Sequence, residues 1–255
     1  MPPAGEPLRL LVLGGTREAR ELAGHLAGDP RIAVVTSLAG RTRTPHVPPG
    51  ELRVGGFGGS DGLVAWLRRE RVCFLVDATH PFARQISVHA LAACRRLGLP
   101  SLRLERPCWR PAPGDRWIEA ADLDAALALL PRFGMRVFAS LGRGALPHLA
   151  GCSECRFLLR TVEPLSPLPA NVEAVAARPP YTVAGDRALL LRFGAEVLVV
   201  RNSGGVGGVS KLLAARELGL PVVMIARPPP LPGRRVASVA EAVAAVTAYL
   251  RGRRM

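Results

Sequence analysis

The sequence predicts an α/β protein made of two Rossmann-like parallel-sheet domains. Three observations lead to this prediction: short apolar runs alternate with helical patterns along the chain, the segment 93–107 recurs at 214–228, and a proline-rich connector occupies 107–113. Short buried strands that alternate with helices are typical of parallel sheets covered by helices. At 255 residues, 49% of them hydrophobic, the chain is long enough to bury a core.

The first series of elements begins with a strand from Leu8 to Leu13, and a helix that ends near Ala27 follows it. The next expected elements are strands at 32–36, 52–54, 73–76 and 101–104, with helices at 63–69 and 81–97. In the last of these helices Ile86, Ala90 and Ala93 fall on one face, as in a helix that packs on a sheet.

The second series follows the connector and has the same alternation. We expect strands at 136–139, 157–161, 197–200 and 222–225, and helices at 186–193, 209–218 and 240–250. Aligned at an offset of 121 residues, 93–107 and 214–228 are identical at 8 of 15 positions. Internal duplication of this kind indicates two related halves, although Gly and Pro are also common wherever a helix leads into a strand.

Both copies contain Leu-Gly-Leu-Pro, and Gly98 and Gly219 stand where a helix ends on a left-handed residue. We therefore expect an N-terminal domain at 1–110 and a C-terminal domain at 111–255. Because both copies leave their last strand through Arg-Pro, the segments that follow could exchange strands between the domains, and the sequence leaves this open.

The charge is strongly basic, with 34 Lys and Arg against 20 Asp and Glu and a net charge of +14. A nucleic-acid-binding protein is one explanation, but such proteins gather basic and aromatic residues into a patch. Only 5% of the residues are aromatic and the arginines are scattered over both halves, which disfavours it. No secretory signal or membrane-spanning stretch is recognisable, so we expect a soluble cytoplasmic protein.

The five cysteines are expected to be reduced, because a chain of this length does not depend on disulfides. Cys152 and Cys155 form a CxxC motif with His148 nearby, but no second motif supplies the remaining ligands of a structural zinc site. We expect no metal, and incidental cysteines are favoured over metal binding or redox chemistry.

Gly14, Gly15 and Thr16 follow the first strand, at the position where a dinucleotide-binding fold places phosphate against a helix N-terminus. Thr16 and Ala19 replace two glycines of the GxGxxG pattern, so an ordinary turn between strand and helix remains an alternative. Arg17, in the first helical turn, could reach a phosphate.

The end of the second strand indicates which nucleotide is bound. An NAD site usually has Asp or Glu there, whereas a 2′-phosphate needs hydroxyl groups and arginine. The chain has Ser37, Arg41 and Arg43 in this region, which favours NADPH over NADH. Solvated loop charges are the alternative for the two arginines.

Two further strand ends of the first half carry candidate residues. The glycine-rich loop at 55–59, which includes Gly56, allows a ligand to approach the backbone, although it could be purely structural. Thr79 and His80 follow the fourth strand at the carboxyl edge of the sheet, where ligands of α/β proteins bind. Either could instead cap a helix that begins at Pro81.

In the second half, the segment Arg201 to Gly208 occupies the corresponding edge and precedes Lys211, which is the one lysine in the chain. The spacing differs from a P-loop, yet anion binding by this glycine-rich loop is plausible. Arg143 ends another strand and is a further candidate cation. No hydrolytic triad, HExxH or paired-carboxylate motif is found, which suits hydride transfer, because the cofactor carries that chemistry.

Taken together, these segments resemble the precorrin-6A reductase family of cobalamin biosynthesis, which includes the cobalt-precorrin-6A reductases. The resemblance spans nearly the whole chain and is carried by the segments 13–19, 55–59, 77–83, 104–107, 202–205 and 211–219. It implies NADPH-dependent reduction of one double bond of precorrin-6A, which gives precorrin-6B, by two Rossmann-like domains.

The expected sites combine the residues with this resemblance. The expected NADPH-binding residues are Gly14, Gly15, Thr16, Arg17, Ser37, Arg41, Gly56 and Thr79. The expected substrate-binding residues are His80, Arg143, Arg201, Asn202, Ser203 and Lys211, because cationic groups recognise the carboxylates of a precorrin. The catalytic residue is left unknown, with His80, Arg201 and Lys211 as candidates.

The expected partner is precorrin-6A, with no nucleic acid, no membrane and at most transient contacts with neighbouring enzymes of the pathway. A different NADPH-dependent reductase of an anionic substrate is the main alternative.

Overall fold

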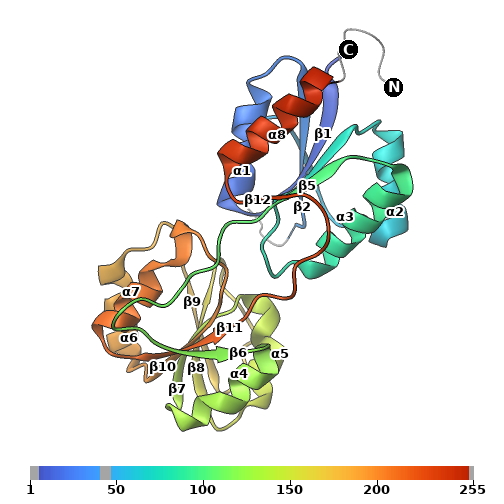
Figure 1. The fold of residues 1–255 in the computed structure, drawn as a ribbon. Helices are drawn as coiled ribbons and strands as arrows, with labels where there is room; N and C mark the ends of the chain where they lie inside the picture. Colours follow the sequence, from blue (N-terminus) through green and yellow to red (C-terminus); the bar gives the residue numbers. More distant parts are fainter. Residues whose placement is uncertain (1–5, 41–46, 253–255) are drawn as a thin grey trace. The chain divides into compact units, whose positions relative to one another are not determined.

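The structure is a computed structural model that describes residues 6–40 and 47–252. It forms two compact units, one made of Met1–Pro107 with Pro228–Met255 and the other of Cys108–Arg227. Each unit contains a six-stranded parallel sheet with helices packed on it, as Figure 1 shows. The predicted α/β class with two Rossmann-like parallel-sheet domains is therefore confirmed.

The first unit has the strand order β12-β5-β4-β1-β2-β3. Its elements are β1 (Leu8–Leu13), α1 (Arg17–Ala27), β2 (Ile32–Leu38), β3 (Glu51–Val54), α2 (Gly59–Arg69), β4 (Phe74–Asp77), α3 (Arg84–Leu97), β5 (Ser101–Leu104), β12 (Arg235–Val236) and α8 (Val239–Gly252). From β1 the sheet extends through β2 and β3 to one side and through β4, β5 and β12 to the other, so the strand order reverses between β1 and β4. Ligands of open α/β sheets bind beyond the carboxyl ends of the strands at such a reversal.

The second unit repeats this topology in the order β6-β11-β10-β7-β8-β9. Its elements are β6 (Arg116–Ala120), α4 (Leu123–Leu129), β7 (Arg136–Ser140), α5 (Leu146–Gly151), β8 (Arg156–Thr161), β9 (Val172–Ala176), α6 (Val183–Phe193), β10 (Val197–Arg201), α7 (Ser210–Glu217) and β11 (Pro221–Ile225). Strand β6 takes the edge position that β12 takes in the first unit, so the duplication extends to the whole sheet.

The expected domain limits of 1–110 and 111–255 need one correction. The first boundary falls at 107/108, close to the expected one, but residues 228–252 belong to the first unit. The physical reason is that β12 completes the hydrogen bonding of β5: Arg103 N donates to Arg234 O at 2.9 Å, and Glu105 N donates to Val236 O at 2.9 Å. Strand β6 pairs with β11 in the same way, so strands are exchanged between the two halves of the sequence.

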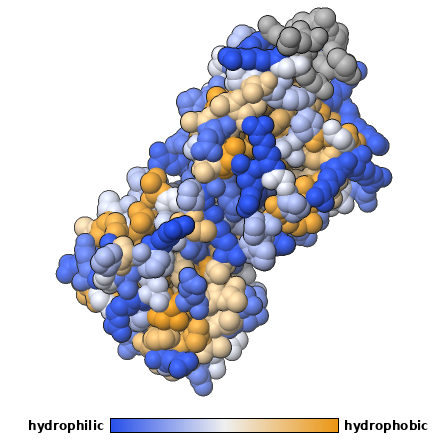
Figure 2. Space-filling view, viewed as in Figure 1, coloured by the Kyte–Doolittle hydropathy of each residue, from blue (hydrophilic) through white to orange (hydrophobic). Residues whose placement is uncertain are grey.

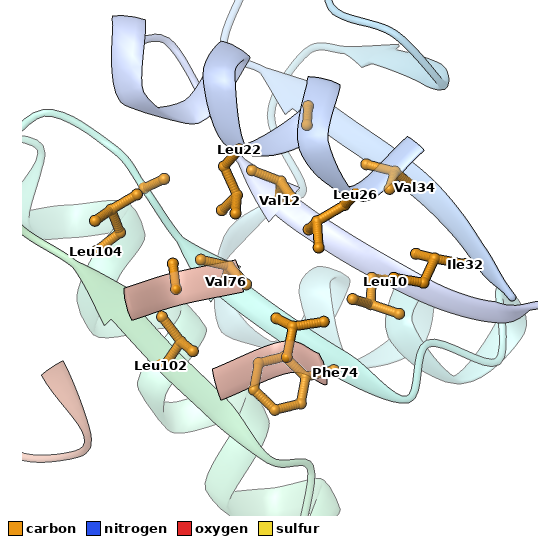
Figure 3. Packing of buried hydrophobic residues seen from close by; sticks show 14 of the residues in the cluster. Leu10, Val12, Leu22, Leu26, Ile32, Val34, Phe74, Val76, Leu102 and Leu104 are labelled. Atoms are coloured by element: carbon orange, nitrogen blue, oxygen red, sulfur yellow. The ribbon is translucent and has the colours of Figure 1, made fainter. Parts of the chain in front are cut away.

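The core of the first unit lies on both faces of its sheet. Leu10 and Val12 of β1 face α1 and α8, where they pack with Leu22 and Val246, and Figure 3 shows much of this cluster. Leu11 and Leu13 point to the other face. Successive residues of a strand point to opposite faces, and a strand covered on both faces is apolar throughout. The apolar run at 8–13 is explained in this way.

Several element predictions are confirmed and others need correction. Gly98 and Gly219 have the expected left-handed conformation, with φ of 59° and 66°. Helix α3 begins at Arg84 rather than Pro81, because residues 81–82 form a turn. The expected elements omitted β6, α4, α5, β9 and β12, which are short or only partly apolar.

The surface carries hydrophilic side chains with apolar ones interspersed among them, as the face drawn in Figure 2 shows. Exposed large apolar residues such as Val54, Val88 and Leu191 are spread over different elements. Within the described residues, every helix is too short or too polar to span a membrane.

Candidate functional site

One row of residues crosses the carboxyl edge of the first sheet from strand to strand. The strand registers pair, in order, Arg235, Arg103, Asp77, Leu13, Ser37 and Arg53. We call this set the carboxyl-edge row. Four of the expected cofactor residues, Gly14, Gly15, Thr16 and Thr79, follow the row directly on β1 and β4, and Ser37 is a member of it. The fold thus brings this part of the predicted site together.

The turn between β1 and α1 depends on its two glycines. A Cβ atom on Gly14 would lie 3.0 Å from Thr36 Cγ2 and 3.1 Å from Leu38 Cδ2, so a side chain there would push against β2 and these neighbours would have to shift. Gly15 has φ of +107°, and a Cβ on it would meet nothing within 4 Å. The backbone of the turn is therefore close to β2 on one side and open on the other, as a phosphate-binding turn requires.

Thr16 fixes the start of α1. Its hydroxyl accepts a hydrogen bond from Ala19 N at 3.0 Å and donates one to Ala78 O at 2.8 Å. The same side chain therefore caps the helix and ties the turn to the end of β4. Arg17 points elsewhere: its exposed guanidinium pairs with Glu21 at 2.6 Å along the helix.

Ser37 and Arg53 are register partners on β2 and β3. Arg53 Nη1 donates to Ser37 Oγ at 3.3 Å and to Gly55 O at 2.5 Å, and Nη2 donates to Gly56 O at 2.6 Å. Its guanidinium lies 3.7 Å from the centre of the Phe57 ring. Arg41, which was also expected here, lies outside the described residues, as does Arg43.

Arg53 is a candidate that sequence reasoning missed. Neighbouring arginines of this edge are neutralised by carboxylates: Arg17 by Glu21, and Arg106 by Glu18 at 2.7 Å. Among the described residues, Arg53 bonds only neutral oxygens. Burial lowers its pKa, and the nearby Arg69 lowers it further. The site therefore contains a cationic group whose charge no acid of the site offsets. An arginine two residues before Gly55, near the end of β3, was the available signal.

The end of β4 is a buried polar cluster. Asp77 Oδ1 accepts hydrogen bonds from Thr79 Oγ1 at 2.7 Å and from Thr79 N at 3.1 Å, while Oδ2 binds Arg103 Nη1. Arg103 also donates to Ser87 Oγ at 2.6 Å and to Glu105 Oε2 at 3.2 Å. The hydroxyl of Thr79, expected to bind the cofactor, is thus already engaged inside the protein.

His80 follows this cluster and is half-buried. Its Nδ1 accepts a hydrogen bond from Phe82 N at 3.2 Å, and the two rings lie 5.9 Å apart. The alternative that Thr79 or His80 caps the next helix is wrong, because α3 begins at Arg84 with Ala83 before it and no side-chain cap. His80 caps a short turn instead.

The corresponding row of the second sheet has a different chemical character. The registers pair Glu119, Met224 and Val200 in order, and the next positions along the row are Ser140, Arg160 and Val175. Leu141, which is buried, follows Ser140 where Gly14 follows Leu13. Helix α5 has only six residues and no side-chain cap. At the position after β7, the second unit therefore has neither a glycine in place of Gly14 nor a capped helix of the length of α1.

Arg143 begins the turn after β7 and is exposed. In the described part of the chain its guanidinium has no hydrogen bond or ion pair. The preceding Gly142 has φ of +76°, like Gly15 in the first unit. Arg143 is therefore available for an anionic ligand, as its sequence position suggested. Arg201 ends β10 and is half-buried.

Asn202, expected to bind substrate, is engaged with the chain itself. Its Oδ1 accepts from Trp109 N at 2.8 Å and its Nδ2 donates to Trp109 O at 3.0 Å. Arg227 donates to the carbonyl oxygens of Asn202 and Ser203 at 2.8 and 2.9 Å. Trp109 and Arg227 lie at the two ends of the second unit, which spans Cys108–Arg227. The loop that contains Asn202 and Ser203 therefore binds both ends of this unit.

Lys211 is 5% exposed and belongs to the same loop region. Its Nζ donates to Gly208 O at 2.6 Å and lies 5.0 Å from the centre of the Trp109 ring. It thus braces the glycine-rich segment before α7. Sequence reasoning missed the role of Trp109, which comes from a segment about 100 residues away.

A second buried charged cluster lies in the second unit and was also missed. Arg160 pairs with Asp186, whose other oxygen accepts from Ser210 Oγ at 2.6 Å, and the guanidinium lies 3.9 Å from the centre of the Tyr181 ring. Burial raises the pKa of the Tyr181 hydroxyl. The cluster joins β8, α6 and α7.

All five cysteines are free, as expected. Burial raises the pKa of the Cys155 thiol to about 12 and that of Cys94 to about 11. In the described ranges, no three His, Cys, Asp or Glu side chains gather as a set of metal ligands.

The fold and the first-unit turn define the chain as a protein of two Rossmann-like domains with a turn suited to a nucleotide phosphate. The sequence model of a family described as precorrin-6x reductase CbiJ/CobK matches residues 9–247. The chain belongs to this family, as the resemblance predicted.

Individual relatives agree with this assignment. A precorrin-6A reductase of Rhodococcus erythropolis is 47% identical over 238 residues, covering 92% of this chain and 96% of the relative. That of Rhodobacter capsulatus is 46% identical over 238 residues, covering 92% and 94%. A cobalt-precorrin-6A reductase of Methanothermobacter thermautotrophicus is 30% identical over 255 residues, covering 88% and 78%. A solved structure named CobK precorrin-6A reductase has a TM-score of 0.88 and 43% identity, covering 94% of this chain and 96% of that one.

Proposed function

We propose that the protein reduces precorrin-6A to precorrin-6B in cobalamin biosynthesis with NADPH as the hydride donor. The family is one of reductases, which implies a nicotinamide cofactor. The choice of NADPH rests on one observation, the pair of Ser37 and Arg53 at the ends of β2 and β3. A hydroxyl and an unneutralised guanidinium suit a 2′-phosphate, and the sequence has no acidic residue between Ser37 and Glu51 to hold a ribose hydroxyl.

The cofactor fits the first unit rather than the second. Gly14 lets the turn lie close to β2 and Gly15 leaves its other side open, whereas the second unit has Leu141 in the place of Gly14. In this proposal the pyrophosphate is bound by the backbone N–H groups of Gly15, Thr16 and Arg17, while Gly14, whose N–H donates to Ser37 O at 2.9 Å, keeps the turn close to β2. Ser37, Arg41 and Arg53 bind the 2′-phosphate. When bound, NADPH supplies the hydride for the reduction.

The remaining cofactor contacts come from backbone. Gly56 is exposed beside Arg53, and its carbonyl is oriented by that guanidinium at 2.6 Å. Thr79 keeps its hydroxyl on Asp77, so we assign it a backbone contact and a role in shaping the turn. His80, half-buried and next to this turn, is our candidate for a side chain near the reacting atoms.

Substrate binding is assigned to the second unit. Arg143 is an exposed guanidinium that has no acidic partner among the described residues, and it suits the acetate and propionate groups of a precorrin. Arg201, half-buried at the end of β10, is the second candidate. The contacts of Asn202, Ser203 and Lys211 indicate that these residues shape the loop, with any substrate contact coming from their remaining donors and acceptors.

We propose that the metal-free precorrin is the substrate. Relatives named precorrin-6A reductase are 42–47% identical to this chain, whereas those named cobalt-precorrin-6A reductase are 30% identical. We also propose a cytoplasmic location and only transient contacts with other enzymes of the pathway.

The test is to mix the purified protein with NADPH and precorrin-6A under anaerobic conditions. Nicotinamide oxidation and the change in the tetrapyrrole spectrum should proceed together at a one-to-one ratio. NADH and the cobalt-bearing substrate, each used in a parallel reaction, should give lower kcat/KM. A folded protein that changes neither spectrum would refute the proposal.

A further inference from the structure

The carboxyl-edge row contains a buried ion pair that the cofactor and substrate assignments do not use. The side chains of Asp77 and Arg103 are 8% and 12% exposed, and they join neighbouring positions of β4 and β5. The returning strap Leu231–Arg235 covers them, and together these residues line a small cavity of about 40 Å³. Taking two charges out of water costs desolvation free energy, so a buried ion pair is expected to have a role that offsets this cost.

The second unit shows that the sheet does not require this pair. In the repeat alignment Arg103 corresponds to Met224, and Val200 is the register partner of Met224 as Asp77 is of Arg103. Val200 and Met224 are buried and apolar in a sheet of the same strand order. Apolar replacement of buried ion pairs is often neutral or stabilising. The second unit therefore provides an internal comparison, because a sheet of the same topology forms there with apolar residues at both positions. The charges of Asp77 and Arg103 must have a role other than stabilising the sheet.

What the pair holds is the segment after β4. Asp77 Oδ1 receives both the amide and the hydroxyl of Thr79, and Ala78 O receives the hydroxyl of Thr16. Residues 78 and 79 are thus fixed from two sides. His80 follows directly, so its position at the sheet edge depends on this arrangement.

We infer that Asp77 and Arg103 are positioning residues for the reduction: their ion pair holds Thr79, and with it His80, in the geometry that the reacting groups need. Arg103 orients the carboxylate by binding one oxygen, while Ser87 and Glu105 hold the guanidinium. The other oxygen is then directed at Thr79. Small displacements of positioned groups reduce rates strongly, whereas binding is less sensitive. This inference rests on the proposed function, since it concerns the rate of that reaction.

The test variant is Asp77→Val with Arg103→Met, which gives the first unit the residues of the second. It removes both charges of the pair together, so neither Asp77 nor Arg103 stays buried without the other. Glu105 loses its bond from Arg103 in this variant, and Glu105→Gln alone measures the effect of that loss. We expect a folded protein whose kcat falls by about 20-fold or more, a larger factor than the accompanying rise in its Kd for NADPH, because the cofactor keeps its contacts with β1, α1 and β2. Amide exchange at Thr79, followed by mass spectrometry without any ligand, should become at least about tenfold faster.

Two further variants separate positioning from general damage. Asp77→Asn keeps the volume and an oxygen acceptor for Thr79, so its kcat should lie between the wild type and the double variant. Arg9→Met with Glu51→Gln and Glu70→Gln removes the ion pairs of Arg9 with Glu51 at 2.6 Å and with Glu70 at 3.1 Å, near the amino ends of the strands, and its kcat should stay within about twofold of wild type.

Folding and kcat of the variants test whether Asp77 and Arg103 are positioning residues. A folded double variant with near-wild-type kcat, or one whose loss equals that of the Arg9 control, overturns the inference. A double variant that does not fold also overturns it, since the pair would then be needed by the sheet. An inactive wild type would instead refute the proposed function, and exchange at Thr79 would still report whether the pair holds the segment.

Discussion

Thr16 connects two strand ends of the first unit, because its hydroxyl donates a hydrogen bond of 2.8 Å to the carbonyl oxygen of Ala78 while it caps α1 through Ala19 N. The residue is buried, and both of its bonds lie inside the protein. The cofactor turn is therefore attached to the segment that follows β4, and the two cannot move independently without breaking this bond.

Thr16→Val should remove both bonds at nearly constant volume. We expect a loss of about 1–3 kcal/mol in the free energy of unfolding, from the lost cap and the unsatisfied Ala78 carbonyl. The Kd for NADPH should also rise. Urea unfolding and a fluorescence titration measure the two effects, and Thr16→Ser, which keeps the hydroxyl, should restore both. Equal behaviour of the Val and Ser variants would contradict the role of this hydroxyl.

Arg53→Met should reduce the preference for NADPH over NADH. The loss of a charge-assisted bond to the 2′-phosphate is worth about 1.5–3 kcal/mol, or roughly 10- to 100-fold in the ratio of kcat/KM values. Arg68→Met is the matched control, because Arg68 is an exposed arginine on the adjacent helix α2, and the ratio should not change there. Arg41→Ala should also lower the ratio. An unchanged preference in the Arg53 variant would assign that residue to the loop alone.

Arg143→Ala should raise the KM for precorrin-6A by about tenfold and leave the Kd for NADPH unchanged, since a guanidinium that binds a carboxylate is lost without any change in the first unit. Arg156→Ala, an exposed arginine at the amino end of β8, provides the control and should have little effect on either constant. Weaker NADPH binding in the Arg143 variant would show that this arginine serves the cofactor instead.

Glu196 should make the second unit sensitive to acid. Its carboxylate accepts hydrogen bonds from the backbone N–H groups of Arg136 and Met135, which lower its pKa below the ordinary 4.5. A lowered pKa means that the stabilisation is complete above the unfolded-state value and is lost as the pH falls through the folded-state value. The stability advantage over Glu196→Gln should therefore shrink between about pH 6 and about pH 3, as urea midpoints would show. A constant difference would disprove it.

The sequence predicted much of the first unit because its signals are local. The apolar run at 8–13, the glycines at 14 and 15 and the left-handed Gly98 each act through their immediate neighbours, and the structure has a strand, a tight turn and a helix end there. The predicted cofactor residues of β1, β2 and β4 meet at one edge, because parallel strands present their carboxyl ends together.

Elements without a local signal were not predictable. Strand β12 has two residues, too few for a periodicity, and it exists because β5 offers free hydrogen-bonding groups to the returning chain. Asn202 was expected to face a ligand, but its amide binds the backbone of Trp109, 93 residues earlier. Contacts over such distances leave no pattern in a single sequence.

By itself the sequence determined the α/β class, the duplication, the turn that suits a phosphate and the family, because each is written in neighbouring residues or in the order of motifs. Only the tertiary structure decided which half the final residues 228–252 complete, and that Asp77 faces Arg103 while Arg53 faces Ser37. The physical reason is that strand pairing and the burial of charged groups depend on which segments become neighbours in space. Those neighbours are determined only when the sheets form.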